Sequence, residues 1–190
     1  MFTDSPPPKG KLAQFQESDR TVTLALPPPA ELLTLAQSID AGMRAGKGPE
    51  VRVGCGRFLQ SLSQFSGVPP CGIRVLASRP LRIRENWSSE LFGDYDPSTM
   101  AIRVWMRTAV KKEVTSFGTF FSTLCHEYCH HLDFQHFKFA DSWHTRWFYE
   151  RAAALYHHAR ATAPKRLLGA NQGRTLANRL AAHQSRLERE

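Results

Sequence analysis

The residues His126-Glu127-Tyr128-Cys129-His130 constrain this chain more than any other stretch of its sequence. On an α-helix, residues four apart lie on one face, so the two histidines would point the same way. Such a pair can bind one zinc ion, and the glutamate beside the first histidine can act as a base on a metal-bound water. The pattern therefore predicts a helix that carries both metal ligands and a catalytic group.

The sequence around this motif has the periodicity of a helix with one buried face. On a helical wheel of about 100° per residue, its apolar side chains gather within about 60° of the pole opposite His126. These side chains are Phe117, Phe120, Phe121, Leu124, Tyr128 and Leu132. Ser116 is a suitable N-cap residue. We therefore expect a helix over residues 116–135 that packs its apolar face on a core and presents the histidines on the other side.

The rest of the chain predicts an α+β fold, with a small mixed sheet between helical segments. The last two predicted strands form a hairpin across the turn at residues 96–99. The predicted helices are 30–45, 58–65, 116–135 and 142–160, and the predicted strands are 21–26, 73–77, 81–84, 90–95 and 101–106.

Length and composition favour one ordinary domain with appended segments. The chain has 190 residues, of which 42% are hydrophobic, which is enough for a single core. Residues 1–29 are expected to form a flexible N-terminal segment, because they begin with a polar, proline-rich stretch. Residues 30–160 would form the domain, and residues 161–190 a basic tail of helical propensity.

The N-terminal residues show no apolar core of a secretory signal, and no run approaches the roughly 20 apolar residues of a membrane span. We therefore expect a cytoplasmic protein without membrane association. Four cysteines in such a chain are expected to be thiols rather than a disulfide framework. Cys125 and Cys129 lie beside the motif histidines, where they are alternative metal ligands or, as we favour, small buried hydrophobic residues.

A catalytic zinc site usually takes three protein ligands and leaves a fourth position for water. Among the candidates, His131 lies about 140° around the helix from His126 and should point away. His144 and Glu150 both stay open as the third ligand, and they lie about 120° apart on a helix, so both cannot face one metal. The candidates downstream of the motif are His131, Asp133, His136, Asp141, His144 and Glu150.

The motif, followed by His144 with Phe148 four residues later, resembles the SprT-like zinc metallopeptidase domain. The third ligand of that family is a histidine in a similar segment at comparable distance. Residues 93–96 and 102–104 also resemble the hairpin that precedes the motif helix in the family. The resemblance implies a zincin-like metallopeptidase domain, with an active-site helix between the small sheet and a following helix.

Across roughly residues 50–160, the resemblance implies a zinc-dependent metallopeptidase that hydrolyses peptide bonds. The implied mechanism is attack of a zinc-bound water assisted by Glu127 as the catalytic base. The implied zinc ligands are His126, His130 and His144. Asp133 and Asp141 are conceivable acceptors for the second ring nitrogen of a ligand histidine.

A polypeptide substrate could bind as an extended strand along a sheet edge near the metal. The predicted strand at 90–95 is the candidate edge, and Gly93 is a position where a peptide or a bulge could approach closely.

The net charge of +8 is equally compatible with a solvated basic surface and with an anionic partner such as nucleic acid. The basic tail at 161–190 is the segment expected to contact it. An alternative function is therefore a non-catalytic, zinc-stabilised nucleic-acid-binding protein. Glu127 favours the peptidase, because a purely structural metal site needs no base.

Overall fold

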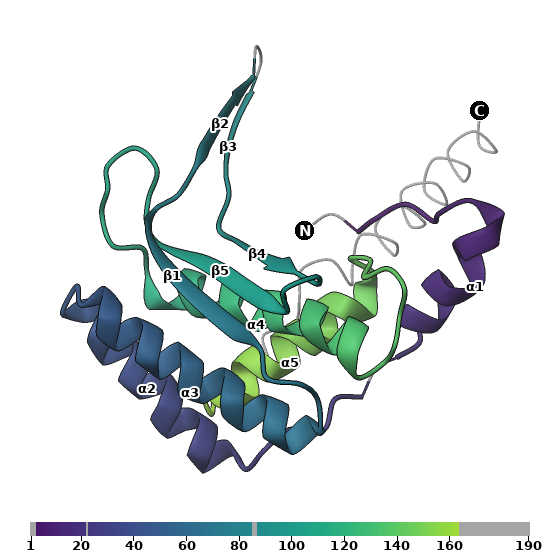
Figure 1. Cartoon of the computed structure of the whole chain (residues 1–190), viewed down its shortest axis with the longest axis horizontal. Helices are drawn as coiled ribbons and strands as arrows, with labels where there is room; N and C mark the ends of the chain where they lie inside the picture. Colours follow the sequence, from purple (N-terminus) through teal and green to yellow (C-terminus); the bar gives the residue numbers. More distant parts are fainter. Residues whose placement is uncertain (1–2, 22, 85–86, 164–190) are drawn as a thin grey trace, which may run out of the picture.

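The computed structural model describes residues 3–21, 23–84 and 87–163, and these form an α+β fold of five helices, a three-stranded mixed sheet and a two-stranded hairpin (Figure 1). The elements in chain order are α1 (Lys9–Ser18), α2 (Pro29–Arg44), α3 (Gly48–Ser66), β1 (Gly72–Ser78), β2 (Leu81–Arg84), β3 (Trp87–Glu90), β4 (Gly93–Asp96), β5 (Ala101–Arg107), α4 (Phe117–Gln135) and α5 (Arg146–Ala159). The prediction of an α+β fold with a small mixed sheet is confirmed.

The three-stranded sheet has β5 at its centre. β5 pairs in parallel with β1 and antiparallel with β4, which makes β4 an edge strand of the sheet. Asp94 lies opposite Arg103 in the β4–β5 register, and the guanidinium Nε donates to the carboxylate at 2.8 Å. The separate hairpin of β2 and β3 points away from the helices (Figure 1).

The helices cover one face of this sheet. Side chains alternate along β5, so Ile102 and Val104 are buried towards the helices while Arg103 is exposed on the opposite face. α3 packs against β1, and α4 packs against β4 and β5. α2 and α5 pack in turn against these two helices, which encloses one apolar core.

Helix α3 is longer than its predicted range of 58–65. Val51 and Cys55 are both fully buried. They lie on the same buried stripe as Phe58 and Leu62 and extend it towards the N-terminus of the helix. The helix ends at Gly67, whose φ of 63° is a left-handed conformation that glycine adopts without strain.

Helix α4 confirms the prediction made from its periodicity. Its predicted apolar stripe packs in the core, and Phe121 and Leu124 there are fully buried. The Ser116 hydroxyl accepts a hydrogen bond from the backbone N–H of Thr119 at 3.2 Å, which confirms Ser116 as the N-cap.

Within the N-terminal segment predicted at 1–29, the described residues are not wholly irregular, and the prediction that this segment is flexible stays a prediction. It contains α1, and Ser18 at the end of that helix is fully buried. The strand predicted at 21–26 is wrong, since residue 21 and residues 23–26 adopt no strand. At its start, the carbonyl oxygens of Ser18 and Thr21 accept hydrogen bonds from the guanidinium of Arg151, at 3.3 and 2.6 Å, rather than from a neighbouring strand.

Two further boundaries shift. α5 begins at Arg146 rather than at residue 142, because the Thr145 hydroxyl caps it by accepting from the N–H of Phe148 at 3.1 Å. The predicted hairpin is confirmed, but its first strand begins at Gly93, while Glu90 ends β3 and pairs with Arg79 at 2.9 Å.

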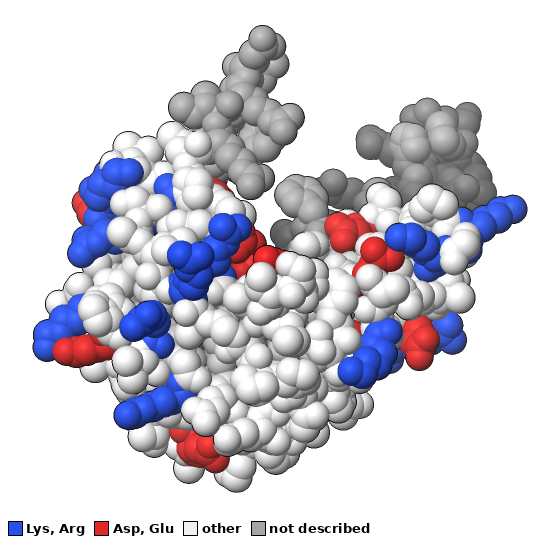
Figure 2. Space-filling view, viewed as in Figure 1, with Lys and Arg blue, Asp and Glu red and all other residues white. Residues whose placement is uncertain are grey.

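On the face seen in Figure 2, lysine and arginine side chains are spread over the surface, with acidic side chains among them. The predicted basic tail at 161–190 lies almost wholly outside the described residues, so its role stays a prediction. The helices that the structure describes include none long and apolar enough to cross a membrane. All four cysteines are buried thiols, as predicted.

Candidate metal centre

Three histidine side chains converge on one point at the surface of α4. The Nε2 atoms of His126, His130 and His144 form a nearly equilateral triangle, with sides of 3.1, 3.2 and 3.2 Å. Among the histidine, cysteine, aspartate and glutamate side chains in the described part of the chain, these three histidines lie close enough together to hold a metal ion.

The local sequence explains why these rings meet. His126 and His130 are one turn apart on the face of α4 that points away from the core. His144 lies in the extended segment before α5, because the Thr145 cap starts the helix after it. The ring of Phe148 lies beneath all three imidazoles, with centroids 4.6–5.2 Å away, and gives the triangle an apolar floor.

Burial keeps the two α4 histidines neutral. Desolvation, with the neighbouring His144 as a smaller cause, lowers the pKa of His126 to about 4. The same effect, with His126 and His144 nearby, lowers the pKa of His130 to about 2. At neutral pH both rings therefore lack a positive charge and offer a lone pair to a metal ion.

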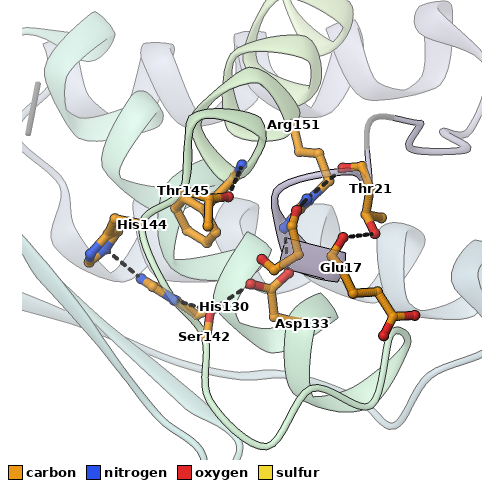
Figure 3. Close-up of polar contacts among 10 residues, drawn as sticks. Glu17, Thr21, His130, Asp133, Ser142, His144, Thr145 and Arg151 are labelled. Atoms are coloured by element: carbon orange, nitrogen blue, oxygen red, sulfur yellow. Dashed lines mark hydrogen bonds and ion pairs between the residues drawn. The ribbon is translucent and has the colours of Figure 1, made fainter. Parts of the chain in front are cut away.

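A chain of buried hydrogen bonds orients His130 (Figure 3). The Ser142 hydroxyl donates to Asp133 Oδ2 at 2.7 Å, and Asp133 Oδ1 accepts from Arg151 Nη2 at 2.7 Å. Since the single proton of Ser142 is used in this way, its oxygen must accept from His130 Nδ1, which lies 2.7 Å away. The proton of His130 is thus on Nδ1, and its Nε2 carries a lone pair.

His144 has an acidic neighbour on its outer side. Asp4 Oδ2 accepts the backbone N–H of His144 at 2.9 Å and lies 3.5 Å from its Nδ1. When Nδ1 of His144 carries the ring proton, it faces this carboxylate, and Nε2 then has a lone pair for a metal ion. With that tautomer, the Nε2 lone pairs of His130 and His144 face each other across 3.2 Å, an arrangement that a cation between them would stabilise.

The triangle fits zinc. Tetrahedral zinc with Zn–N bonds of about 2.0–2.1 Å holds its nitrogen ligands roughly 3.3 Å apart. The observed separations of 3.1–3.2 Å are close to this value. Three imidazole nitrogens are a donor set that can hold a metal ion and leave one position open.

Glu127 lies beside this triangle, with only 7% of its surface exposed. Burial, with Asp94 as a smaller cause, raises the pKa of its carboxyl to about 8. Strand β4 approaches it at Gly93, where an added Cβ would lie 3.0 Å from Glu127 Cγ and 2.5 Å from Thr123 Cγ2. Glycine is therefore required for this close approach between β4 and α4.

Two hollows flank Glu127, and both are bordered by Gly93, His126 and Glu127. One, of about 440 Å³, also contains His130 and His144. The other, of about 500 Å³, lies between Phe92, in the connection from β3 to β4, and residues of α5. Together they form an open trough on both sides of the carboxylate.

The structure places the other candidate ligands elsewhere. His131 hydrogen-bonds to the Tyr95 hydroxyl and to a backbone carbonyl on the far side of α4, and His136 is exposed at the helix end. Asp141 forms a salt bridge with Lys11, so it does not hold a ligand ring as suggested from sequence. Glu150 is not in the cluster of donors.

Sequence reasoning missed two residues that support the site, Ser142 and Arg151. Arg151 occupies a buried position on the stripe of α5 that also carries Phe148 and Leu155. Its position on the apolar face of a predicted helix could have identified Arg151 from sequence, because a buried guanidinium requires a buried acidic partner. Ser142 gave no comparable signal, since its role depends on the fold of the loop before His144.

Comparison with known proteins gave no match to any family model, to any curated protein or to any solved structure.

Proposed function

We propose that this chain is a zinc-dependent metallopeptidase with a zincin-like, SprT-like domain. One observation carries the proposal: the buried carboxyl group of Glu127 borders a triangle of three imidazole nitrogens in an open hollow. A structural zinc site is normally closed by four protein ligands and needs no such carboxylate. The three histidines are the proposed ligands, and Glu127 is the proposed base.

A zinc ion held by the three Nε2 atoms would supply a water of lowered pKa and polarise the scissile carbonyl. Glu127 contributes the proton transfers. A pKa close to neutral pH suits a group that first accepts a proton from water and then donates it to the leaving amine. The buried chain from Arg151 to His130 holds one ligand ring in a fixed orientation while this occurs.

The edge strand β4 provides a place for an extended polypeptide. The side of β4 away from β5 has no neighbouring strand among the described residues, and Gly93 brings its backbone to the carboxylate of Glu127. Backbone pairing along such an edge holds a peptide without requiring particular side chains. This supports a polypeptide substrate in extended conformation.

The larger hollow offers a subsite for one substrate side chain. Its wall on α5 is formed mainly by tyrosine and alanine residues at helical spacing, and Phe92 closes the opposite side. Such a wall favours an apolar or aromatic side chain next to the scissile bond. The stripe on α5 consists of Tyr149, Ala152, Ala153, Tyr156 and His157.

The test is cleavage of an unfolded protein substrate, such as casein, by the zinc-loaded chain and by Glu127→Gln. The variant keeps the shape of the side chain but cannot accept the proton, so we expect turnover to fall by about 10²–10⁴-fold while the zinc content stays at one ion. Glu113→Gln, which alters an exposed glutamate outside the trough, is the control and should cleave at the normal rate. Unchanged cleavage by Glu127→Gln would exclude Glu127 as the base.

A non-catalytic nucleic-acid-binding protein is the second prediction from the sequence, and the same preparation separates it from the peptidase. It requires zinc and salt-dependent DNA binding without cleavage of any polypeptide. The dispersed basic side chains in Figure 2 do not favour it over the peptidase.

A further inference from the structure

The third proposed ligand, His144, lies on a loop, where no helix or strand fixes its position. His144 is in the irregular segment between α4 and α5, outside both helices. His126 and His130, by contrast, are fixed by the backbone of α4. The position of His144 therefore depends on contacts from outside the loop.

These contacts come from the N-terminal strap, defined as residues 3–21. Asp4 is the nearest: its N–H donates to the carbonyl of His144 at 3.1 Å, and its carboxylate accepts the N–H of His144 at 2.9 Å. The same carboxylate oxygen lies 3.5 Å from His144 Nδ1. Asp4 thus hydrogen-bonds to the backbone of His144 on both sides and also lies close to its ring.

Two more residues of the strap contact the same loop. Lys11 forms a salt bridge of 2.8 Å with Asp141, and the ring of Phe15 packs edge-on against Trp143 at 5.7 Å. The strap therefore contacts the loop at residues 141, 143 and 144, along the stretch that carries the proposed ligand.

The far end of the strap is anchored in the core. Arg151, which is 1% exposed, donates through Nη1 to the carbonyls of Ser18 and Thr21 and through Nη2 to Asp133. Asp133 in turn accepts from the serine that orients His130 (Figure 3). One buried guanidinium therefore links the strap to the support of a second ligand.

We propose that the N-terminal strap assembles the metal centre, with Asp4 as the positioning residue that holds His144 in ligand geometry. The inference rests on the metal centre of the proposed function. It goes beyond that function because it makes the metal affinity depend on Asp4, which is 140 positions from His144 in the sequence. Asp4 acts through His144 and does not itself touch the metal.

The test compares full-length wild type, Asp4→Ala, Asp4→Asn and Glu17→Ala. Zinc affinity is measured by competition with a chromogenic chelator, and ligand geometry by the visible absorption of the cobalt-loaded protein. Loss of a partner that orients a ligand costs about 10–100-fold in metal affinity, and we expect Asp4→Ala to weaken zinc binding within that range. Asp4→Asn keeps an oxygen for the His144 N–H and should lose less.

Glu17→Ala is the matched control, because it removes an exposed carboxylate from the same strap. It should leave the zinc affinity unchanged. The thermal midpoint of the metal-free protein should be the same in all four proteins, since the Asp4 side chain is 43% exposed and adds little to the core. A shifted cobalt spectrum in Asp4→Ala alone would show altered ligand geometry rather than general destabilisation.

The outcomes separate the two proposals. Zinc binding by Asp4→Ala equal to that of wild type would overturn the role of the strap and leave the metal centre intact. Failure of wild type itself to bind zinc would overturn both. A weakened affinity shared equally by Glu17→Ala would also overturn the specific role of Asp4.

Discussion

The Nε2 atoms of His130 and His144 lie 3.2 Å apart, while the second nitrogen of each ring faces an oxygen atom. When both rings carry their proton on Nδ1, their Nε2 lone pairs are directed at each other. Proteins satisfy such an arrangement with a cation, and the separation suits tetrahedral zinc. This relationship is the physical basis for assigning a metal centre to the chain.

The choice between His144 and Glu150 as third ligand predicts opposite results for two variants. His144→Ala should bind zinc far more weakly, by more than the about 10–100-fold that loss of a supporting hydrogen bond costs. Glu150→Ala should bind zinc as wild type does, because Glu150 is not in the cluster of donors. Metal analysis after dialysis measures both, and zinc loss in Glu150→Ala alone would reverse the assignment.

Gly93 should be intolerant of a side chain because of its contacts with α4. In Gly93→Ala the new Cβ would meet Thr123 Cγ2 at 2.5 Å and Glu127 Cγ at 3.0 Å. Overpacking of this kind costs about 1–3 kcal/mol, and displacement of Glu127 should also lower kcat. Urea unfolding and peptide cleavage measure the two effects.

Adding Thr123→Ser to Gly93→Ala supplies a control for that clash. Serine lacks Cγ2 but keeps the hydroxyl that donates to the Thr119 carbonyl at 2.9 Å. The double variant should recover part of the lost stability. No recovery would show that the close contact with Thr123 is not what requires glycine at this position.

The motif helix could be predicted from sequence, because its signals are local. The spacing of apolar residues from Phe117 to Leu132 and the capping serine at 116 depend only on helix geometry. The hairpin of β4 and β5 was predictable for the same reason, from two runs around a turn with Pro97. Boundaries still shifted where a neighbouring cap or an ion pair, as at Thr145 and Glu90, ended an element.

The supports of the site could not be predicted, because they join residues far apart in the chain. Asp4 meets His144, and Arg151 meets both Ser18 and Asp133, only after the helices have packed. α1 has little apolar periodicity, and tertiary contacts hold it in place. The choice of His144 over Glu150 likewise depends on where α5 begins. The predicted helix began at residue 142 and so included His144, whereas α5 begins at Arg146 and leaves His144 in the preceding loop.

Arg151 should be one of the most sensitive positions for stability. It and Asp133 are both buried, at 1% and 0% side-chain exposure, and removal of one partner leaves the other charge uncompensated. Breaking such a pair costs about 3–5 kcal/mol, so Arg151→Ala should lower the free energy of unfolding by that order. Arg146→Ala, at an exposed position on the same helix, should change it by less than about 0.5 kcal/mol. Urea denaturation distinguishes the two, and similar values for both variants would contradict the pairing.

The cysteines should be unreactive in the native protein. Burial raises the pKa of Cys55 and Cys129 well above the ordinary thiol value, and raises that of Cys71 to about 12. The thiolate needed for alkylation is therefore scarce at pH 8. Iodoacetamide followed by intact-mass measurement should show little modification in the native state and four adducts after denaturation. Rapid native labelling of Cys129 would contradict the packing of α4.

The most direct test of the metal centre is anomalous diffraction from crystals of the zinc-loaded protein, recorded on both sides of the zinc absorption edge. We expect one anomalous peak about 2.0–2.1 Å from the Nε2 atoms of His126, His130 and His144, with Glu127 beside it and not among the ligands. A peak bound by Glu150 in place of His144, or no peak at the three imidazoles, would contradict it.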